Sequence, residues 1–398
     1  MYGLVLEGGG AKGSYQVGAY KAINECGLEI SAVAGTSIGA LNGAMIVQGD
    51  FEECLELWDD IRYSDIIRDN DQELNRLLHS KPDIHTVKMV ADKLRGVISN
   101  KGFDIAPFRN MIARYTREDE IRNSPIEFGI ATYNLTDRIP MELFKEDIPC
   151  GEMKDYLLAS SYMPFFKIEK IGGKTLLDGW FHDNLPYHML LRKGYTNLII
   201  VRTHQMNPGE LEDIKDLDPI IVYPKEDLGR AFDLDSSKIK RNMKMGYCDA
   251  LKEIRDLKGR RYYVRPEGEK FYFQYLESIG NDKIEELCKL LHIDSKPGLS
   301  ILFGHIIPRL GSMMDIEEGY DYETFIIYII EYILEAGEVE RFEVYSFEEL
   351  TRMLNQNNGR FRKREYSRYD NIMNRFGNLV PFNRDEILLE AARIIFMD

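Results

Sequence analysis

The sequence predicts an α/β fold with a mostly parallel sheet flanked by helices, followed by a smaller helix-rich C-terminal region. In the N-terminal part, short apolar runs alternate with longer segments of helical periodicity, which is typical of a parallel sheet with crossover helices. After an aromatic opening stretch, residues 259–398 are rich in helix signals. A length of 398 residues is enough for about two domains. We therefore expect one α/β domain over 1–258 and an extension over 259–398.

The expected strands are short and apolar, as in a sheet that is buried on both faces. They cover 3–8, 30–35, 126–133, 174–179, 196–203 and 219–224. The expected helices cover 13–25, 37–48, 51–62, 104–115, 152–160 and 236–257. Further on, Ser346 with Glu349 and Asn383 with Glu386 have the spacing of capping boxes, which predicts helix starts. The apolar run 325–334 is too short to span a bilayer and predicts a buried helix.

The composition excludes several classes of protein. A net charge of −15 argues against nucleic-acid binding, which depends on Lys and Arg meeting phosphates. The five cysteines are scattered without C-x-x-C spacing, so we expect reduced thiols and no zinc site. The N-terminus lacks a basic region ahead of a longer apolar stretch, and no signal peptide is expected. We therefore expect a cytoplasmic protein.

The glycine-rich stretch LEGGGAKGSY follows the first expected strand and has two interpretations. Gly8, Gly10 and Gly13 match the spacing of a dinucleotide-binding loop. The acidic residue that should close the second strand is missing, however, and so is the Gly-Lys-Ser/Thr order of a Walker A loop. Nucleotide binding is therefore an alternative only. In the other interpretation, bare N–H groups at a helix N-terminus form an anion site, to which Lys12 adds positive charge.

The stretch VAGTSIGALNGA places Ser37 between Gly35 and Gly39, where an expected strand meets an expected helix. This is the context of a nucleophile elbow, a sharp turn that exposes a serine hydroxyl. A proton acceptor is expected later in the chain, and LLDGWFHDNLP contains both Asp178 and His182. In a dyad, a partly buried Asp178 with a raised pKa would take the proton directly. In a triad, His182 would be the base and Asp178 would orient it, but such a short loop makes this geometry awkward.

These motifs together resemble the patatin-like phospholipases, acyl-ester hydrolases with a Ser–Asp dyad. The resemblance covers about residues 1–205 and includes DIAPFRNMI, FGIATYNLTD and YLLASSYMPFFKIEKIGGKTLLDGWFHDNLP. It implies a three-layer sandwich with Ser37 as the nucleophile and Asp178 as the base. It also implies an oxyanion loop that consists of Gly8, Gly9, Gly10 and Lys12. Where the family usually has Asp-Gly-Gly or Asp-Gly-Ala, this chain has Trp180, whose ring would narrow or cap the acyl channel.

We expect a serine esterase that hydrolyses the acyl esters of phospholipids or lysophospholipids through an acyl-enzyme, with no metal or cofactor. A catalytically silent lipid- or acyl-binding regulator is the alternative from another class. The stretch GRFRKREYSR at 359–368 is basic in an acidic chain and contains interleaved aromatic residues. It is interpreted either as a solvated loop or as a peripheral contact with the inner membrane surface or an acidic partner. Its basic residues are Arg360, Arg362, Lys363, Arg364 and Arg368.

Overall fold

The computed structural model describes residues 1–68, 103–164, 166–167, 169–207, 209–356 and 384–397. The chain divides into two compact units, Met1–Ile254 and Arg255–Asp398. The boundary expected at 258 lies shortly after this division. The basic stretch 359–368 and the capping residue expected at 383 lie outside the described residues.

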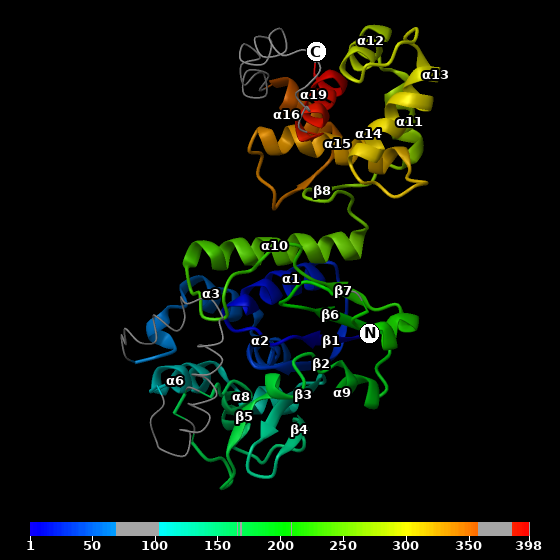
Figure 1. The fold of residues 1–398 in the computed structure, drawn as a ribbon. Helices are drawn as coiled ribbons and strands as arrows, with labels where there is room; N and C mark the ends of the chain where they lie inside the picture. Colours follow the sequence, from blue (N-terminus) through cyan, green and yellow to red (C-terminus); the bar gives the residue numbers. More distant parts are fainter. Residues whose placement is uncertain (69–102, 165, 168, 208, 357–383, 398) are drawn as a thin grey trace. The chain divides into compact units, whose positions relative to one another are not determined.

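The first unit is built on a sheet that, within the described residues, has seven strands (Figure 1). The strand order is β4-β3-β2-β1-β6-β7, and β5 also pairs with β3. The strands are β1 (Tyr2–Leu6), β2 (Ile30–Thr36), β3 (Glu127–Asn134), β4 (Ile139–Phe144), β5 (Leu176–Asp178), β6 (Leu198–Val201) and β7 (Ile220–Val222). Neighbours from β3 to β7 along this order are parallel, whereas β4 and β5 are antiparallel to β3. The mostly parallel sheet that the sequence predicts is thus confirmed.

Helices cover both faces of this sheet. They are α1 (Gly13–Glu25), α2 (Ile38–Val47), α3 (Phe51–Asp60), α6 (Ala106–Tyr115), α7 (Glu118–Asn123), α8 (Met153–Ser160), α9 (Tyr187–Arg192) and α10 (Ser236–Arg255). Helix α2 packs through Gly43 against Val33 and Phe128 of the sheet. Helix α9 packs with the alternate residues of the same strands, Ala32 and Ala34 among them. Because successive side chains of a strand point to opposite faces, the fold is a three-layer sandwich.

Helix α10 packs tightly on α1. Gly18 of α1 lies against the Met243 carbonyl, and Gly246 of α10 lies against the Tyr15 carbonyl, so neither glycine has room for a Cβ atom. The buried Tyr15 hydroxyl also donates to Asp249 at 2.8 Å. Helix α10 is therefore an integral layer of the first unit.

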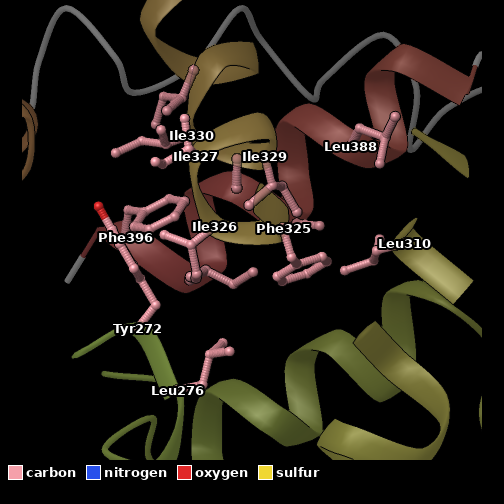
Figure 2. Packing of buried hydrophobic residues seen from close by; sticks show 14 of the residues in the cluster. Tyr272, Leu276, Leu310, Phe325, Ile326, Ile327, Ile329, Ile330, Leu388 and Phe396 are labelled. Carbon is pink, nitrogen blue, oxygen red and sulfur yellow. The ribbon is translucent and has the colours of Figure 1, made fainter. Parts of the chain in front are cut away.

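The second unit has its own core, made mainly by helices, and the helix-rich region that the sequence predicts is thus confirmed (Figure 2). They are α11 (Glu269–Glu277), α12 (Asn281–Leu290), α13 (Leu299–Ile301), α14 (Ile307–Met313), α15 (Tyr322–Ala336), α16 (Phe347–Gln356) and α19 (Arg384–Phe396), with a π-helical turn at Leu302–Ile306 and two short parallel strands, β8 (Tyr263–Val264) and β9 (Val344–Tyr345). The apolar run 325–334 lies in α15 and is buried, as predicted. Ser346 and Glu349 exchange capping-box hydrogen bonds at the start of α16, also as predicted. Among the described residues, no helix is both long and apolar enough to cross a membrane.

Candidate active site

Ser37 lies at the sharp turn between β2 and α2. Its backbone has φ 55° and ψ −124°, in the left-handed half of the φ range that non-glycine residues seldom adopt. Two glycines allow the turn, because Gly35 lies against the Gly39 backbone and Gly39 lies against the Leu6 carbonyl of β1. A side chain at either position would push α2 away from the sheet. The strand-to-helix turn expected from the sequence is therefore present.

Two hydrogen bonds of the Ser160 hydroxyl hold this turn in place. The Ser37 N–H donates to the Ser160 hydroxyl at 2.9 Å, and that hydroxyl donates to the Ala131 carbonyl at 2.6 Å. Ser160 is fully buried at the end of α8. The bond from Ser37 pairs one of the N–H groups that a helix leaves without a partner at its first turn. Together the two bonds connect the start of α2 to β3 through the Ser160 side chain of α8. Ser160 belongs to a stretch quoted for the family resemblance, but nothing in its sequence context indicates this role.

The sheet register brings Asp178 to Ser37. Strand β2 pairs with β3 up to Thr36 opposite Ala131, and β5 pairs with β3 from Asp178 opposite Thr132. Because β4 occupies the other edge of β3, β5 lies on the β2 edge and runs against it. The carboxyl ends of β2 and β5 therefore meet head to head. This junction brings Ser37 and Asp178 together, although they are 141 positions apart in the chain.

The Asp178 carboxylate is buried, with 2% of the residue exposed. Burial raises its pKa to about 6, and two hydrogen bonds oppose that rise, one from the Trp180 N–H and one from the Ser37 hydroxyl. The Trp180 N–H lies 2.9 Å from Oδ1. A carboxylate with this pKa is ionised at neutral pH and still basic enough to accept a proton.

The glycine loop follows β1 and faces the same junction. The Gly8 N–H donates to the Asn184 carbonyl at 3.1 Å, and the Ala11 N–H donates to the Ala231 carbonyl at 2.6 Å. Among the described residues, no acceptor is found for the N–H groups of Gly9 and Gly10. Gly10 has φ +59°, and the Ala231 carbonyl leaves no room for a side chain there. The loop thus presents two adjacent backbone donors.

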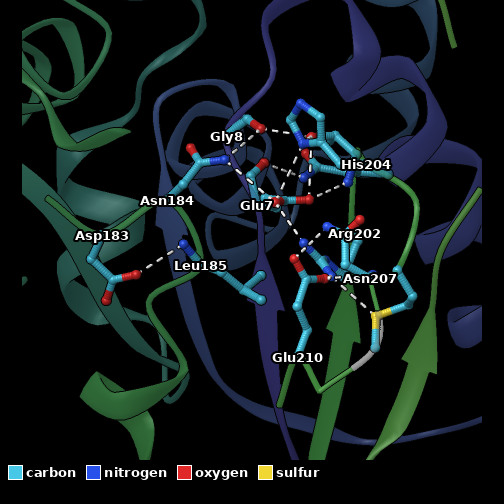
Figure 3. A network of polar contacts seen from close by, with 12 residues as sticks. Glu7, Gly8, Asp183, Asn184, Leu185, Arg202, His204, Asn207 and Glu210 are labelled. Carbon is cyan, nitrogen blue, oxygen red and sulfur yellow. Dashed lines mark hydrogen bonds and ion pairs between the residues drawn. The ribbon is translucent and has the colours of Figure 1, made fainter. Parts of the chain in front are cut away.

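A buried polar network fixes the base of the loop (Figure 3). The Glu7 carboxylate accepts from the Thr203 N–H at 2.6 Å and from Arg202 at 3.3 Å, and it lies 3.3 Å from His204 Nδ1. Burial favours a raised pKa for Glu7, but His204, Arg202 and Thr203 together hold that pKa below its ordinary value. The Thr203 hydroxyl also donates to the Gly8 carbonyl at 2.6 Å. The ends of β1 and β6 are thereby joined beneath the loop.

These groups open into one apolar cavity of about 320 Å³. Ser37, Asp178, Gly8, Gly9, Gly10, Lys12, Asn184 and His204 line it together with apolar side chains from Ile38, Leu41, Trp58, Ile61, Ile66, Phe108, Met111, Met163, Phe166, Phe232 and Leu234. Trp180 also lines the cavity and is 57% exposed, which places its ring at the mouth.

The candidate residues fall into two groups, those that line the cavity and those that do not. The residues expected for the nucleophile, the base and the oxyanion loop, Lys12 included, all line the cavity. Burial lowers the pKa of Lys12, against the opposing charges of Asp227 and Glu7. His182 is exposed and is not among the described lining residues. Asn184, His204 and Glu7 were not predicted from the sequence, because their place depends on the pairing of β1 with β6.

The described residues include no group of three His, Cys, Asp or Glu side chains that could hold a metal ion. The chemistry available at the site is that of a hydroxyl, a buried carboxylate, backbone N–H donors, one lysine, the Asn184 amide and the His204 imidazole. A serine at a strand-to-helix turn, beside a base and a pair of N–H donors, is typical of serine hydrolases.

Part of this chain is similar to known phospholipases. Residues 4–191, just under half of the chain, match the patatin-like phospholipase family model. The chain is similar to the patatin-like phospholipase domain-containing protein 7 of Rattus norvegicus, at 22% identity over 75% of this chain and 20% of the relative. It is also similar to the lysophospholipase nte1 of Aspergillus terreus, at 60% identity over 11% of this chain and 3% of the relative. The chain thus spans a fifth or less of the length of these relatives. The crystal structure of VipD from Legionella pneumophila aligns with 99% of this chain and 91% of its own, at 13% identity and a TM-score of 0.41.

Proposed function

We propose that this protein is a serine hydrolase of lipid acyl esters, with Ser37 as the nucleophile and Asp178 as the base. The observation that carries the proposal is that Ser37, at its strand-to-helix turn, and the buried Asp178 carboxylate meet at the wall of one apolar cavity. Asp178 takes the proton as Ser37 attacks the ester carbonyl and then passes it to the leaving alcohol. It next takes a proton from water, whose oxygen attacks the acyl carbonyl; the bond between the acyl group and Ser37 Oγ then breaks, the acid is released, and Asp178 returns the proton to Ser37.

The N–H groups of Gly9 and Gly10 are the best candidates for stabilising the oxyanion. The Gly8 N–H is hydrogen-bonded to Asn184, so Gly8 contributes shape and not a donor. Each oxyanion donor typically contributes about 3–4 kcal/mol to transition-state binding. Lys12 adds positive charge at the same wall of the cavity.

The apolar lining supports an acyl group as the part of the substrate that is bound. Lipid substrates are also consistent with the names of the relatives, phospholipase and lysophospholipase. Two histidine positions support a dyad: His182 is exposed and outside the described lining, and His204, which lines the cavity, lies 3.3 Å from the Glu7 carboxylate beneath the glycine loop. We therefore propose the dyad.

The test is hydrolysis of p-nitrophenyl butyrate by wild type and three variants. Ser37→Ala and Asp178→Asn are each expected to lower kcat by at least about a thousandfold, while His182→Ala keeps most of the activity. A fluorophosphonate probe should label wild type at Ser37 and leave Ser37→Ala unlabelled. Loss of activity in a folded His182→Ala protein would establish the triad instead, and a wild type without turnover or labelling would favour a lipid-binding regulator.

We further propose that the basic stretch 359–368 contacts an anionic membrane surface. Each of its basic residues near such a surface contributes about 1 kcal/mol of attraction. Replacing Arg360, Arg362, Lys363, Arg364 and Arg368 by Gln should reduce sedimentation with phosphatidylserine vesicles. Turnover of p-nitrophenyl butyrate should be unchanged, and equal sedimentation would identify a solvated loop.

A further inference from the structure

A second, smaller cavity lies next to the one that contains Ser37. It has a volume of about 40 Å³ and shares five lining residues with the main cavity. The shared residues are Ile38, Leu41, Trp58, Ile61 and Met111. Two spaces that share this much wall are separated by a thin layer of side chains.

The lining residues follow a consistent direction along helix α2. Ser37 lines the main cavity, Ile38 and Leu41 line both, and Ala44 and Met45 line the smaller cavity. These positions are three to four residues apart and so share one face of the helix. From Ile38 to Met45 the helix advances by about 10 Å, at a rise of about 1.5 Å per residue. The smaller cavity therefore lies farther from the nucleophile along this face.

Helix α6 shows the same progression. Phe108 lines the main cavity, Met111 lines both, and Tyr115 and Thr116 line the smaller cavity. Helix α3 supplies the third wall, where Trp58 is shared and Cys54 and Leu57 line the smaller cavity.

The wall between the cavities has a fixed part and an adaptable part. The Trp58 ring is held in place, because its Nε1–H donates to Asn42 Oδ1 at 2.9 Å. The Asn42 amide in turn donates to the Gly13 carbonyl and to Gln16. Met111 is half-buried, and an unbranched thioether side chain has three rotatable bonds. Met111 is thus the side chain best able to move aside.

We infer that the smaller cavity is the distal end of the acyl site and receives the last carbons of a long, unbranched acyl chain. The inference rests on the proposed function and deepens it by naming the acyl-chain class. One water-sized group needs about 10–15 Å³ of space, so 40 Å³ accommodates about three methylene-sized groups. Each buried methylene contributes about a fourfold factor in binding. The site should therefore favour long chains over chains that end at Met111.

The experiment measures kcat/KM of the full chain for p-nitrophenyl esters from butyrate to palmitate. Leu57→Phe fills the smaller cavity from a half-buried position on α3. It is expected to shorten the preferred chain by about two to three carbons and to lower the palmitate-to-butyrate ratio at least about tenfold. Met111→Ala removes part of the shared wall and should shift the preference toward longer chains. The matched control is Leu55→Phe, the same substitution at a half-buried position of α3 that lines neither cavity.

A chain-length profile that is identical in wild type, Leu57→Phe and Leu55→Phe would overturn the inference. If melting curves show that Leu57→Phe is unfolded, Thr116→Leu fills the same space from α6. A wild type that hydrolyses none of the esters would instead overturn the proposed function. In that case, calorimetric binding of decanoate and palmitate to Ser37→Ala, with and without Leu57→Phe, decides the inference: a loss of palmitate affinity alone supports it, and equal affinities overturn it.

Discussion

The Asp178 carboxylate is almost completely buried, and only the Trp180 N–H and the Ser37 hydroxyl favour its charged form among the groups that affect its pKa. Burial raises the pKa of Asp178 to about 6, and no described lysine, arginine or histidine counteracts this rise. The carboxylate must be ionised to take the proton from Ser37. We predict that kcat/KM for a soluble ester is constant above pH 7 and falls about tenfold per pH unit below pH 6. A stopped assay between pH 4.5 and 8 measures this, and a profile that stays flat down to pH 5 would contradict the role of Asp178.

The same raised pKa has a consequence for stability. The folded state binds the proton of Asp178 more tightly than the unfolded state, so stability falls as the pH rises from the unfolded value of 3.8 through about 6. At neutral pH the buried charge destabilises the fold by up to about 3 kcal/mol. Asp178→Asn is therefore expected to raise Tm at pH 7 while it abolishes activity.

The gain in Tm should shrink toward pH 4, where wild type is itself protonated. Differential scanning fluorimetry at pH 4 and pH 7 compares the two proteins directly. An Asn variant that is less stable than wild type at pH 7 would mean that the carboxylate is stabilised by its hydrogen bonds more than burial destabilises it.

A candidate site residue can be predicted from the sequence where its residue type and local context indicate the chemistry. Ser37 has a glycine two positions away on either side, just after an expected strand, and Asp178 lies near the end of another. Ser160 could not be found in this way, because its hydroxyl matters only after α8 has been placed beside the turn. For the same reason, the carboxylate of Glu7 gives no local signal of its pairing with β6.

At the scale of elements, the Glu7 side chain connects the end of β1 to the end of β6 through its contacts with Arg202 and Thr203. Glu7→Gln would leave Arg202, 6% exposed, with Glu210 as its remaining carboxylate partner. Losing one partner of a buried ion pair typically costs about 3–5 kcal/mol, and because Glu210 remains we expect about 2–3 kcal/mol. Urea unfolding measures the loss. Glu210→Gln, which changes the more exposed partner, should cost less, and equal costs would mean that the Glu7 contacts do not hold the loop.

The elements that the sequence predicts best are those with one strong periodic signal. The bounds of α1, α2, α3, α6 and α8 agree with the expected ranges within two residues. Strand β4 is absent from the expected set, because it is a half-exposed edge strand that contains Pro140, and proline argues against a strand. The head-to-head meeting of β2 and β5 could not be predicted either, since register depends on how three distant segments pair.

At the scale of the whole molecule, every described residue that lines the main cavity lies between Gly8 and Leu234. The second unit has a separate apolar core around α15, whose buried Glu331 accepts from the N–H groups of residues 260–262. Each unit thus has the burial expected of a domain that folds by itself. The proposed hydrolysis therefore belongs to the first unit, of which α10 is the last helix.

The fragment 1–258 is therefore expected to fold and to hydrolyse p-nitrophenyl butyrate within about threefold of the full chain, since every described residue that lines the cavity lies within it. A matched fragment that ends at 235 lacks α10. It would uncover the α1 surface on which Gly246 packs and leave the Tyr15 hydroxyl without Asp249. An unpaired buried hydroxyl costs about 1–3 kcal/mol, and the exposed apolar face of α1 adds to this. We expect this shorter fragment to be insoluble or to lack a cooperative melting transition. Circular dichroism melting and esterase assays of the two fragments make the comparison, and a folded but inactive 1–258 would mean that the second unit completes the catalytic site.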